Sequence, residues 1–212
     1  GAYVLKKSVP TNGNARETIQ PGDIKYVDQN GDGVVNDQDM VIIGRATPIH
    51  TGGFNNNFTY KGLSLNIFFQ WSYGNDIMNA NRIIFEGNYN GKNINQFRSY
   101  VDHWTPENPT SRNFRPGGQG PRGVYSSRTI EDGSFLRLKT VQLSYTLPEK
   151  WVRRIHLHNV QIFVSGQNLW TWTRYSGLDP EVSTRNSALT PGYDYSAYAR
   201  NRTYMAGLKI AF

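Results

Sequence analysis

Cysteine is absent from the sequence, and so are long apolar runs. Without cysteine, none of the 212 residues can form a disulfide or a thiolate metal site. A membrane-spanning helix needs about 18 consecutive apolar residues, and no run of that length is present. The N-terminus Gly1-Ala2-Tyr3 lacks a basic start followed by an apolar core. We therefore expect neither a transmembrane helix nor a signal peptide in this sequence.

A concentrated positive charge is also missing. The 23 basic and 16 acidic residues leave a net charge of +7, but the basic side chains are dispersed among loops and do not line one helix or stripe. Proteins that bind nucleic acid usually present such a basic face. The sequence therefore indicates no nucleic-acid partner.

No catalytic set of residues is recognisable. His50, His103, His156 and His158 have no local serine, cysteine or aspartate arrangement that would activate a nucleophile. His156 and His158 would share one face of a strand, but two ligands without a third make a weak metal site. Paired carboxylates at the spacing of a hydrolase are missing as well. We therefore expect that the chain is not an enzyme.

What the sequence does contain is a run of oxygen-bearing side chains over residues 28–39, DQNGDGVVNDQD. The spacing matches the ligand positions of a calcium-binding loop, and Gly33 occupies the position of its sharp turn. The candidate ligands are Asp28, Asn30, Asp32, the Val34 carbonyl, Asn36 and Asp39. The sequence therefore predicts a calcium site. The alternative is a polar turn without metal, because Asp, Asn and Gly favour turns by themselves.

The residues that flank this loop indicate what kind of calcium site it is. Residues 24–27 and 40–44 are β-branched or aromatic runs without helical periodicity, so a helix–loop–helix sensor is not expected. Asp39 is also shorter than the glutamate that closes sensor loops. We therefore expect Ca²⁺ to be a structural cofactor that stiffens the loop.

Long alternating segments make up much of the remaining sequence. Residues 53–60 and 63–73 are separated by Lys61-Gly62, and apolar residues alternate with polar ones throughout the second segment, apart from Phe68. Further strands are expected at 134–147, 160–172 and 203–212. The sequence therefore predicts an all-β, antiparallel fold.

Connections of unequal length join these strands. Long ones at 74–133 and 173–200 alternate with short ones. A transmembrane β-barrel has strands of about 9–11 residues, with short turns at one end and long loops at the other. A soluble β-sandwich also alternates its side chains, so this pattern alone does not separate the two folds.

Aromatic residues concentrate at both ends of the expected strands. Rings at these positions suit the two interfaces of a membrane barrel, although aromatic residues favour strands in any protein. The group near the long loops comprises Trp71, Tyr73, Trp170, Trp172 and Tyr204, and the group near the short turns comprises Tyr60, Tyr145, Trp151 and Phe212. We therefore expect a segment of a transmembrane β-barrel.

The last expected strand ends on Phe212, with Tyr204, Leu208 and Ile210 on the same face. A strand with a terminal phenylalanine resembles the sorting signal of bacterial outer-membrane barrels. This resemblance implies that the strand runs from the outside towards the periplasm. The long loops and the calcium loop would then be extracellular.

Taken together, these segments resemble the SusC/RagA-like TonB-dependent outer-membrane transporters of Bacteroidetes. The matching stretches are 21–39, 42–79, DHWTPENP at 102–109, 134–148, 160–181 and the terminal strand. The resemblance implies a barrel of about 22 strands, with this chain as its C-terminal portion in the outer membrane of a Gram-negative bacterium. It also implies import of oligosaccharides or peptides, with a SusD-like surface lipoprotein and the TonB complex as partners.

A plug, a TonB box and enough strands to close a barrel are not recognisable in this sequence. We expect the remaining N-terminal part of the barrel and the plug to complete the wall, since membrane lipid tolerates no unpaired strand edge. Residues 1–52 are expected to form an extracellular loop region, and residues 53–212 the transmembrane strands and their extracellular loops.

The runner-up interpretation is a secreted, calcium-dependent, carbohydrate-binding β-sandwich, in which the apolar strand faces would meet across a core. Residues that contact a substrate are not identified from the sequence. Trp104 and other loop aromatics have rings that stack on sugars or peptides, but such rings also pack loops together.

Overall fold

The computed structural model describes residues 21–24, 26–33, 35, 37–87, 93–118, 126–182 and 191–212. The chain is divided into two compact units. The first comprises Gly1–Arg45, Met78–Ile130 and Tyr193–Ser196, and the second comprises Ala46–Ile77, Glu131–Gly192 and Ala197–Phe212. The division at residue 52 that the sequence suggested stays a prediction.

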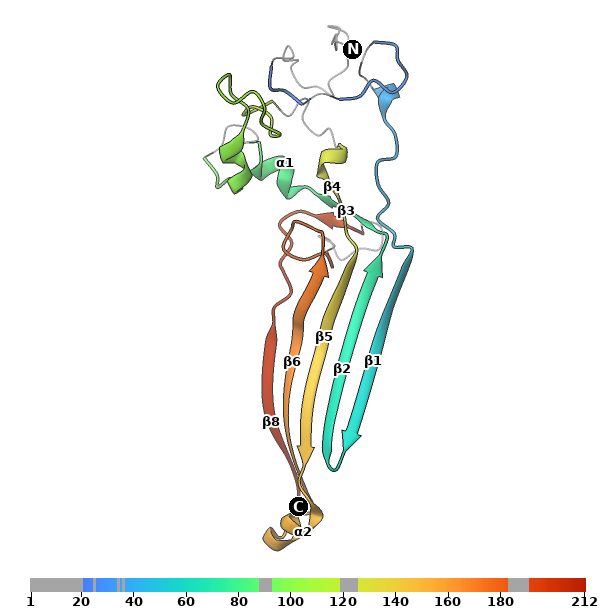
Figure 1. Ribbon diagram of the computed structural model, residues 1–212, viewed down its shortest axis with the longest axis vertical. Coiled ribbons are helices and arrows are strands. Elements are labelled where there is room, and N and C mark those ends of the chain that lie inside the picture. The colour runs from blue at the N-terminus through green and yellow to red at the C-terminus, as the bar shows by residue number, and fades with distance from the viewer. Residues whose placement is uncertain are drawn as a thin grey trace. The chain divides into compact units, whose positions relative to one another are not determined.

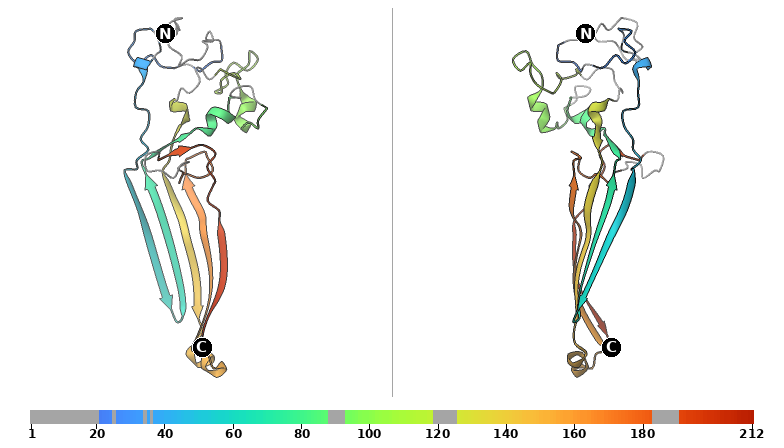
Figure 2. Two further views of the ribbon diagram at one scale, coloured as in Figure 1. Left: turned by 180° about the vertical axis from the view of Figure 1, so that it is seen from behind. Right: turned by 45° about the vertical axis from the view of Figure 1, so that its right-hand side comes forward.

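One antiparallel sheet forms the second unit (Figure 1). Its strands are β1 (His50–Tyr60), β2 (Leu63–Tyr73), β5 (Phe135–Thr146), β6 (Asn159–Thr173) and β8 (Thr203–Ala211), and they follow that order across the sheet. Two further views show the same strands side by side (Figure 2). The expected all-β, antiparallel fold is confirmed.

The strands are as long as a membrane crossing requires. β1 and β2 have 11 residues each, β5 has 12, β6 has 15 and β8 has 9, whereas a tilted strand crosses the hydrocarbon layer in about 9–11 residues. β1 begins at His50 and not at Gly53, because His50 still pairs with Tyr73. The Ile49 N–H also donates to the Tyr73 carbonyl at 2.9 Å.

The register between strands aligns their apolar faces. One row of directly opposed residues runs Phe58, Leu65, Leu143, Val164 and Ala206 across all five strands. The adjacent row runs Asn57, Asn66, Gln142, Ser165 and Met205. Opposed residues in a sheet share a face and successive residues alternate between faces. The sheet therefore has one apolar face and one mainly polar face.

Short connections join the strands at one end of the sheet. Lys61 and Gly62 have positive φ angles of 46° and 84°, as a two-residue hairpin turn requires when its twist matches that of the strands. Between β5 and β6 lie the short helix α2 (Glu149–Val152) and the 3-10 turn η5 (Arg153–Ile155). His156 follows η5 with a left-handed φ of 59° and ends it.

A β-bulge interrupts the alternation in the middle of β5. In the pairing of β5 with β2, Lys139 is an extra residue between Leu138 and Thr140, whereas in the pairing with β6 two residues, Asn168 and Leu169, lie opposite it. The extra residue of a bulge re-aims side chains. The Lys139 side chain consequently reaches Glu181, to which the neighbouring Arg137 also binds.

Outside the large sheet the elements are short. They are η1 (Asp37–Asp39), β3 (Asp76–Asn79), α1 (Asn81–Phe85), η3 (Arg98–Asp102), η4 (Ser127–Thr129), β4 (Ile130–Asp132) and β7 (Tyr193–Asp194). Met78 and Asn79 of β3 pair in parallel with Tyr193 and Asp194 of β7. Among the described residues, no helix is long and apolar enough to span a bilayer.

Candidate functional site

The loop with calcium-type spacing is organised by its own aspartates. Asp28 accepts the Gly31 N–H on Oδ1 at 2.7 Å and the Gly33 N–H on Oδ2 at 2.8 Å. Both glycines have positive φ angles, 75° and 80°, in a region that other residues seldom adopt. Within the same turn, Asn30 Oδ1 accepts the Asp32 N–H at 2.9 Å. The chain is therefore wrapped tightly around the Asp28 carboxylate.

Asp39 closes this loop onto its beginning. Its Oδ1 accepts the Gln29 N–H at 2.8 Å and the Asn30 N–H at 3.4 Å. Asp39 is the last residue of η1, which directs its side chain back to the start of the loop. The first and last predicted ligands thus both bind the loop backbone.

The calcium assignment itself stays a prediction. Asp28, Asn30, Asp32 and Asp39 lie in the described part of the loop, whereas Val34 and Asn36 lie outside the described residues. Within the described ranges, no group of three or more His, Cys, Asp or Glu side chains is arranged to hold a metal ion. A site of this kind would also need the oxygens of Asn30, Asn36 and Val34.

The segment before the loop is fastened to the stretch that follows DHWTPENP, within the first unit. The Ile24 N–H donates to the Gly118 carbonyl and the Arg115 N–H to the Gly22 carbonyl, both at 2.8 Å. Asp23 Oδ1 lies 2.5 Å from Arg115 Nε. These bonds fix where the calcium-type loop begins.

Trp104 packs against this attachment, and Tyr26 follows it closely in the sequence. The Trp104 ring covers Gly22 so closely that a Cβ at that position would overlap the ring. Burial raises the pKa of Tyr26 to about 12. Trp104 therefore packs against the loop at Gly22, which is one of the two uses that the sequence left open.

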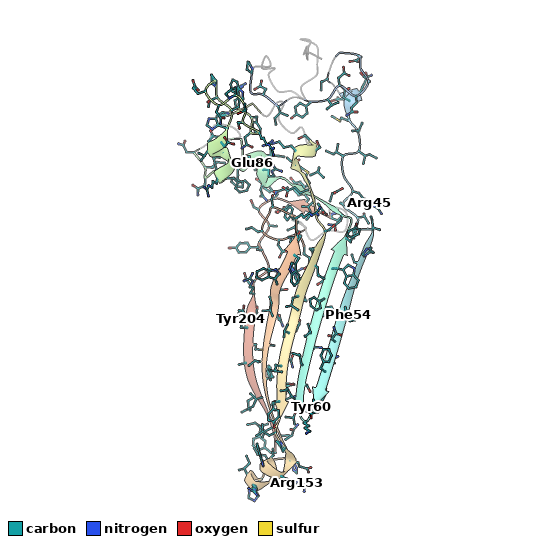
Figure 3. All side chains as sticks on the ribbon, viewed as in Figure 1. Arg45, Phe54, Tyr60, Glu86, Arg153 and Tyr204 are labelled. Atoms are coloured by element: carbon teal, nitrogen blue, oxygen red, sulfur yellow. The ribbon has the colours of Figure 1, made fainter. Side chains whose placement is uncertain are left out.

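The apolar face of the sheet in the second unit is uncovered. Phe54 on β1, Ile162 on β6 and Leu208 on β8 are 58%, 50% and 56% exposed. Figure 3 shows Phe54, Tyr60 and Tyr204 on the outer strands of the sheet. Soluble monomers rarely expose a continuous apolar surface across a whole sheet. A self-contained β-sandwich is disfavoured, because the described residues supply no layer that covers this face.

Aromatic residues cluster at both ends of the apolar face, as the sequence suggested. Trp71 lies opposite Gly52 and donates from Nε1 to Nδ1 of His50 at 3.1 Å. His50 in turn stacks on Tyr73, with ring centroids 5.1 Å apart. At the end with the short turns, Tyr60 and Tyr145 both lie opposite Leu63.

The polar face carries a buried ion-pair cluster that sequence reasoning missed. Arg137 on β5 is 1% exposed. It binds Asp179 through Nη2 at 2.5 Å, Glu181 through Nη1 at 3.1 Å, and the Thr171 hydroxyl through Nε at 3.0 Å. Two further cations, Lys139 and Arg200, contact Glu181 at 3.4 and 2.9 Å. The cluster fastens the segment after β6 onto the sheet.

Hydrogen bonds and charge set the ionisation of Asp179. Burial acts to raise the pKa of this carboxyl group. The Glu181 N–H, the Arg137 guanidinium and the Arg200 N–H oppose this effect and together outweigh it. The pKa of Asp179 therefore lies below its ordinary value, and the carboxylate stays charged beside Arg137.

The sequence around the two acids, Asp179-Pro180-Glu181, gives only the local signal of a turn. A strand residue such as Arg137 on a polar face does not reveal which distant acid it binds. The pairing became visible only when β5 and the segment after β6 were placed together.

Comparison with known proteins reveals the relationships of this chain. No family model matches the sequence. TonB-dependent receptor P26 of Formosa agariphila is 34% identical over 217 residues, which cover 100% of this chain and 22% of that protein. TonB-dependent receptor SusC of Bacteroides thetaiotaomicron is 23% identical and covers 99% of this chain and 19% of that protein.

A solved structure agrees in both fold and sequence. The RagAB peptide importer in its closed-closed state matches 98% of this chain and 21% of the RagAB chain, with a TM-score of 0.72 and 27% identity. The chain belongs to the SusC/RagA-like TonB-dependent transporters. Its sheet is accordingly a segment of barrel wall, and the barrel is not closed by these strands. The relatives are named receptors and importers, which confirms that the chain is not an enzyme.

This SusC/RagA-like chain spans about a fifth of the length of the relatives that it matches. Its five-stranded sheet therefore corresponds to part of a much longer polypeptide in those relatives. The activity, substrates and partners of a whole transporter are accordingly proposals for this chain.

Proposed function

We propose that the chain is the C-terminal part of the wall of a TonB-dependent importer in the outer membrane of a Gram-negative bacterium. The observation that carries the proposal is the continuous apolar face of β1, β2, β5, β6 and β8, exposed in a chain related to TonB-dependent receptors. Hydrocarbon tails would cover this face, and the polar face would line the lumen. The rest of the barrel would pair with the free edges of β1 and β8.

Neighbouring residues of β5 offer a direct test. Leu143 lies on the apolar face and Gln142 on the polar face. In the full-length protein, Leu143→Lys would place a charge in lipid, at a cost below the roughly 2–4 kcal/mol of the bilayer midplane because Leu143 lies two residues from Tyr145 at the short-turn end. Gln142→Lys would place the same charge in the lumen. We expect less Leu143→Lys than Gln142→Lys protein in outer-membrane fractions, and equal amounts would refute the assignment of the faces.

We further propose oligosaccharides or peptides as the imported substrates and a SusD-like lipoprotein as the partner at the extracellular end. Support comes from the relative named SusC and from the neighbour named a RagAB peptide importer. TonB would act on the part of the transporter that lies outside this chain. Co-purification with the tagged full-length protein tests the partner, and a preparation without any SusD-like lipoprotein would argue against it.

We also propose that residues 28–39 hold a structural Ca²⁺ ion. The ion would sit among the oxygens of Asp28, Asn30, Asp32, Val34, Asn36 and Asp39. The wrapped backbone around Asp28 and the closing contact of Asp39 support this proposal, because both bring predicted ligands into one loop.

A further inference from the structure

The connection between β5 and β6 is an ordered, compact turn. Val152 is 1% exposed, and its carbonyl accepts the Leu157 N–H at 3.2 Å. The Trp151 N–H donates to the Pro148 carbonyl at 2.9 Å. These backbone hydrogen bonds and the buried Val152 hold the turn in one conformation, so the positions from which its exposed side chains extend are fixed.

Apart from Glu149, the exposed side chains of residues 149–155 are apolar or basic. Trp151 and Ile155 are 58% and 62% exposed although both are large and apolar. Lys150, Arg153 and Arg154 lie between or beside them in the sequence. Arg153 forms an ion pair with Glu149, whereas among the described residues no ion pair is found for Lys150 or Arg154. The turn therefore combines an exposed apolar surface with uncompensated positive charge.

The turn also lies where the apolar face of the sheet ends. Figure 3 shows Arg153 and Tyr60 towards the same end of the sheet. Lys61, next to Tyr60, lies 5.2 Å above the Tyr60 ring. In the proposed barrel, this end coincides with one boundary between hydrocarbon and headgroups.

We propose that the β5–β6 turn binds the anionic headgroups of phospholipids in the leaflet at the short-turn end of the sheet. Trp151 and Ile155 lie at headgroup level, where an amphipathic ring is stable. Lys150 and Arg154 contact the lipid phosphates, which attract basic residues beside a membrane surface. The charge of the turn selects anionic over zwitterionic lipid. This inference rests on the proposed barrel wall.

Tryptophan quenching tests the proposal in the full-length transporter reconstituted in phosphatidylcholine vesicles with or without phosphatidylglycerol. Bromine is placed on the chains of one lipid at a time, and subtraction of a Trp151→Phe variant isolates the Trp151 signal. We expect brominated phosphatidylglycerol to quench Trp151 preferentially. The double variant Lys150→Gln/Arg154→Gln should reduce that preference roughly thirtyfold, about fivefold for each basic side chain.

A matched variant and a second signal make the outcomes distinct. Arg98→Gln/Arg112→Gln removes the same charge from loops of the first unit and should leave the Trp151 preference unchanged. If Lys150→Gln/Arg154→Gln leaves the preference unchanged, or if Arg98→Gln/Arg112→Gln reduces it equally, headgroup binding by the β5–β6 turn is overturned. Neither result bears on the proposed function. Absence of quenching at Trp170 and Trp172 as well would show that no wall had inserted and would overturn the proposed function with it.

Discussion

Arg137 Nη2 lies 2.5 Å from Asp179 Oδ1, and both side chains are almost completely buried. The pair joins the beginning of the barrel strand β5 to the loop that follows the next strand, β6. A buried charge that loses its partner is costly, typically about 3–5 kcal/mol. Loss of this contact is therefore expected to lower the stability of the protein more than loss of an exposed ion pair.

Arg137→Met should consequently destabilise the protein. The variant keeps much of the side-chain volume but leaves Asp179 and Glu181 without their shared cation. We expect a loss of about 3–5 kcal/mol in the free energy of unfolding, measured by denaturant titration of the full-length protein in detergent. Arg153→Met, which breaks an exposed ion pair, should cost at most about 1 kcal/mol. Similar losses in both variants would contradict the structural role of the buried pair.

The attachment of the loop at Asp179 to the sheet should weaken in acid. Because the folded-state pKa of Asp179 is lowered, its contribution to stability is fully present above the pKa of the unfolded chain. That contribution is lost as the pH falls through the folded-state pKa. We expect proteolysis after Leu178 to stay slow at neutral pH and to accelerate only in acid below the ordinary range of aspartate. If an Asp179→Asn variant keeps the same pH profile of proteolysis, protonation of Asp179 is not the cause of the pH dependence.

The sheet was predictable because its signal is local. Alternation along residues 63–73 and the Lys61-Gly62 turn each depend on a few neighbouring residues, and both identify strands directly. The same holds for the calcium-type loop, since Asp28 binds the N–H groups of Gly31 and Gly33 close by. Such contacts are encoded in the spacing of the residues that make them.

What the sequence did not reveal depends on distant partners. The contact between Arg137 and Asp179 depends on the pairing of β5 with β6. Lys139 also reaches this cluster, from a bulge that no pattern in the sequence predicted. The attachment of Asp23 to Arg115 is equally remote in sequence. The expected long connection at 74–133 also contains β3, α1 and η3, each too short to produce a periodic signal.

Gly62 should tolerate no side chain. Its φ angle is +84°, and an added Cβ would lie 2.6 Å from the Thr146 carbonyl oxygen. Gly62→Val combines a left-handed backbone, which costs roughly 1–2 kcal/mol, with this backbone clash. We expect the free energy of unfolding, measured by denaturant titration, to fall by at least about 2 kcal/mol. Gly31→Val, where an added Cβ meets nothing within 4 Å, should lose only the backbone contribution. Equal losses would show that the Thr146 contact is unimportant.

Removal of two predicted ligands should abolish calcium binding. In Asp28→Ala/Asp32→Ala, the loop loses two carboxylates and also the bonds that Asp28 accepts from Gly31 and Gly33. We expect the purified full-length protein to lose its bound Ca²⁺, measured by elemental analysis, and the loop to become sensitive to protease. Asp37→Asn changes a nearby carboxylate that is not a predicted ligand and should retain the ion. A calcium chelator should make the wild-type loop more sensitive to protease. If the chelator has no effect, the loop is a polar turn whose aspartates order the backbone without metal.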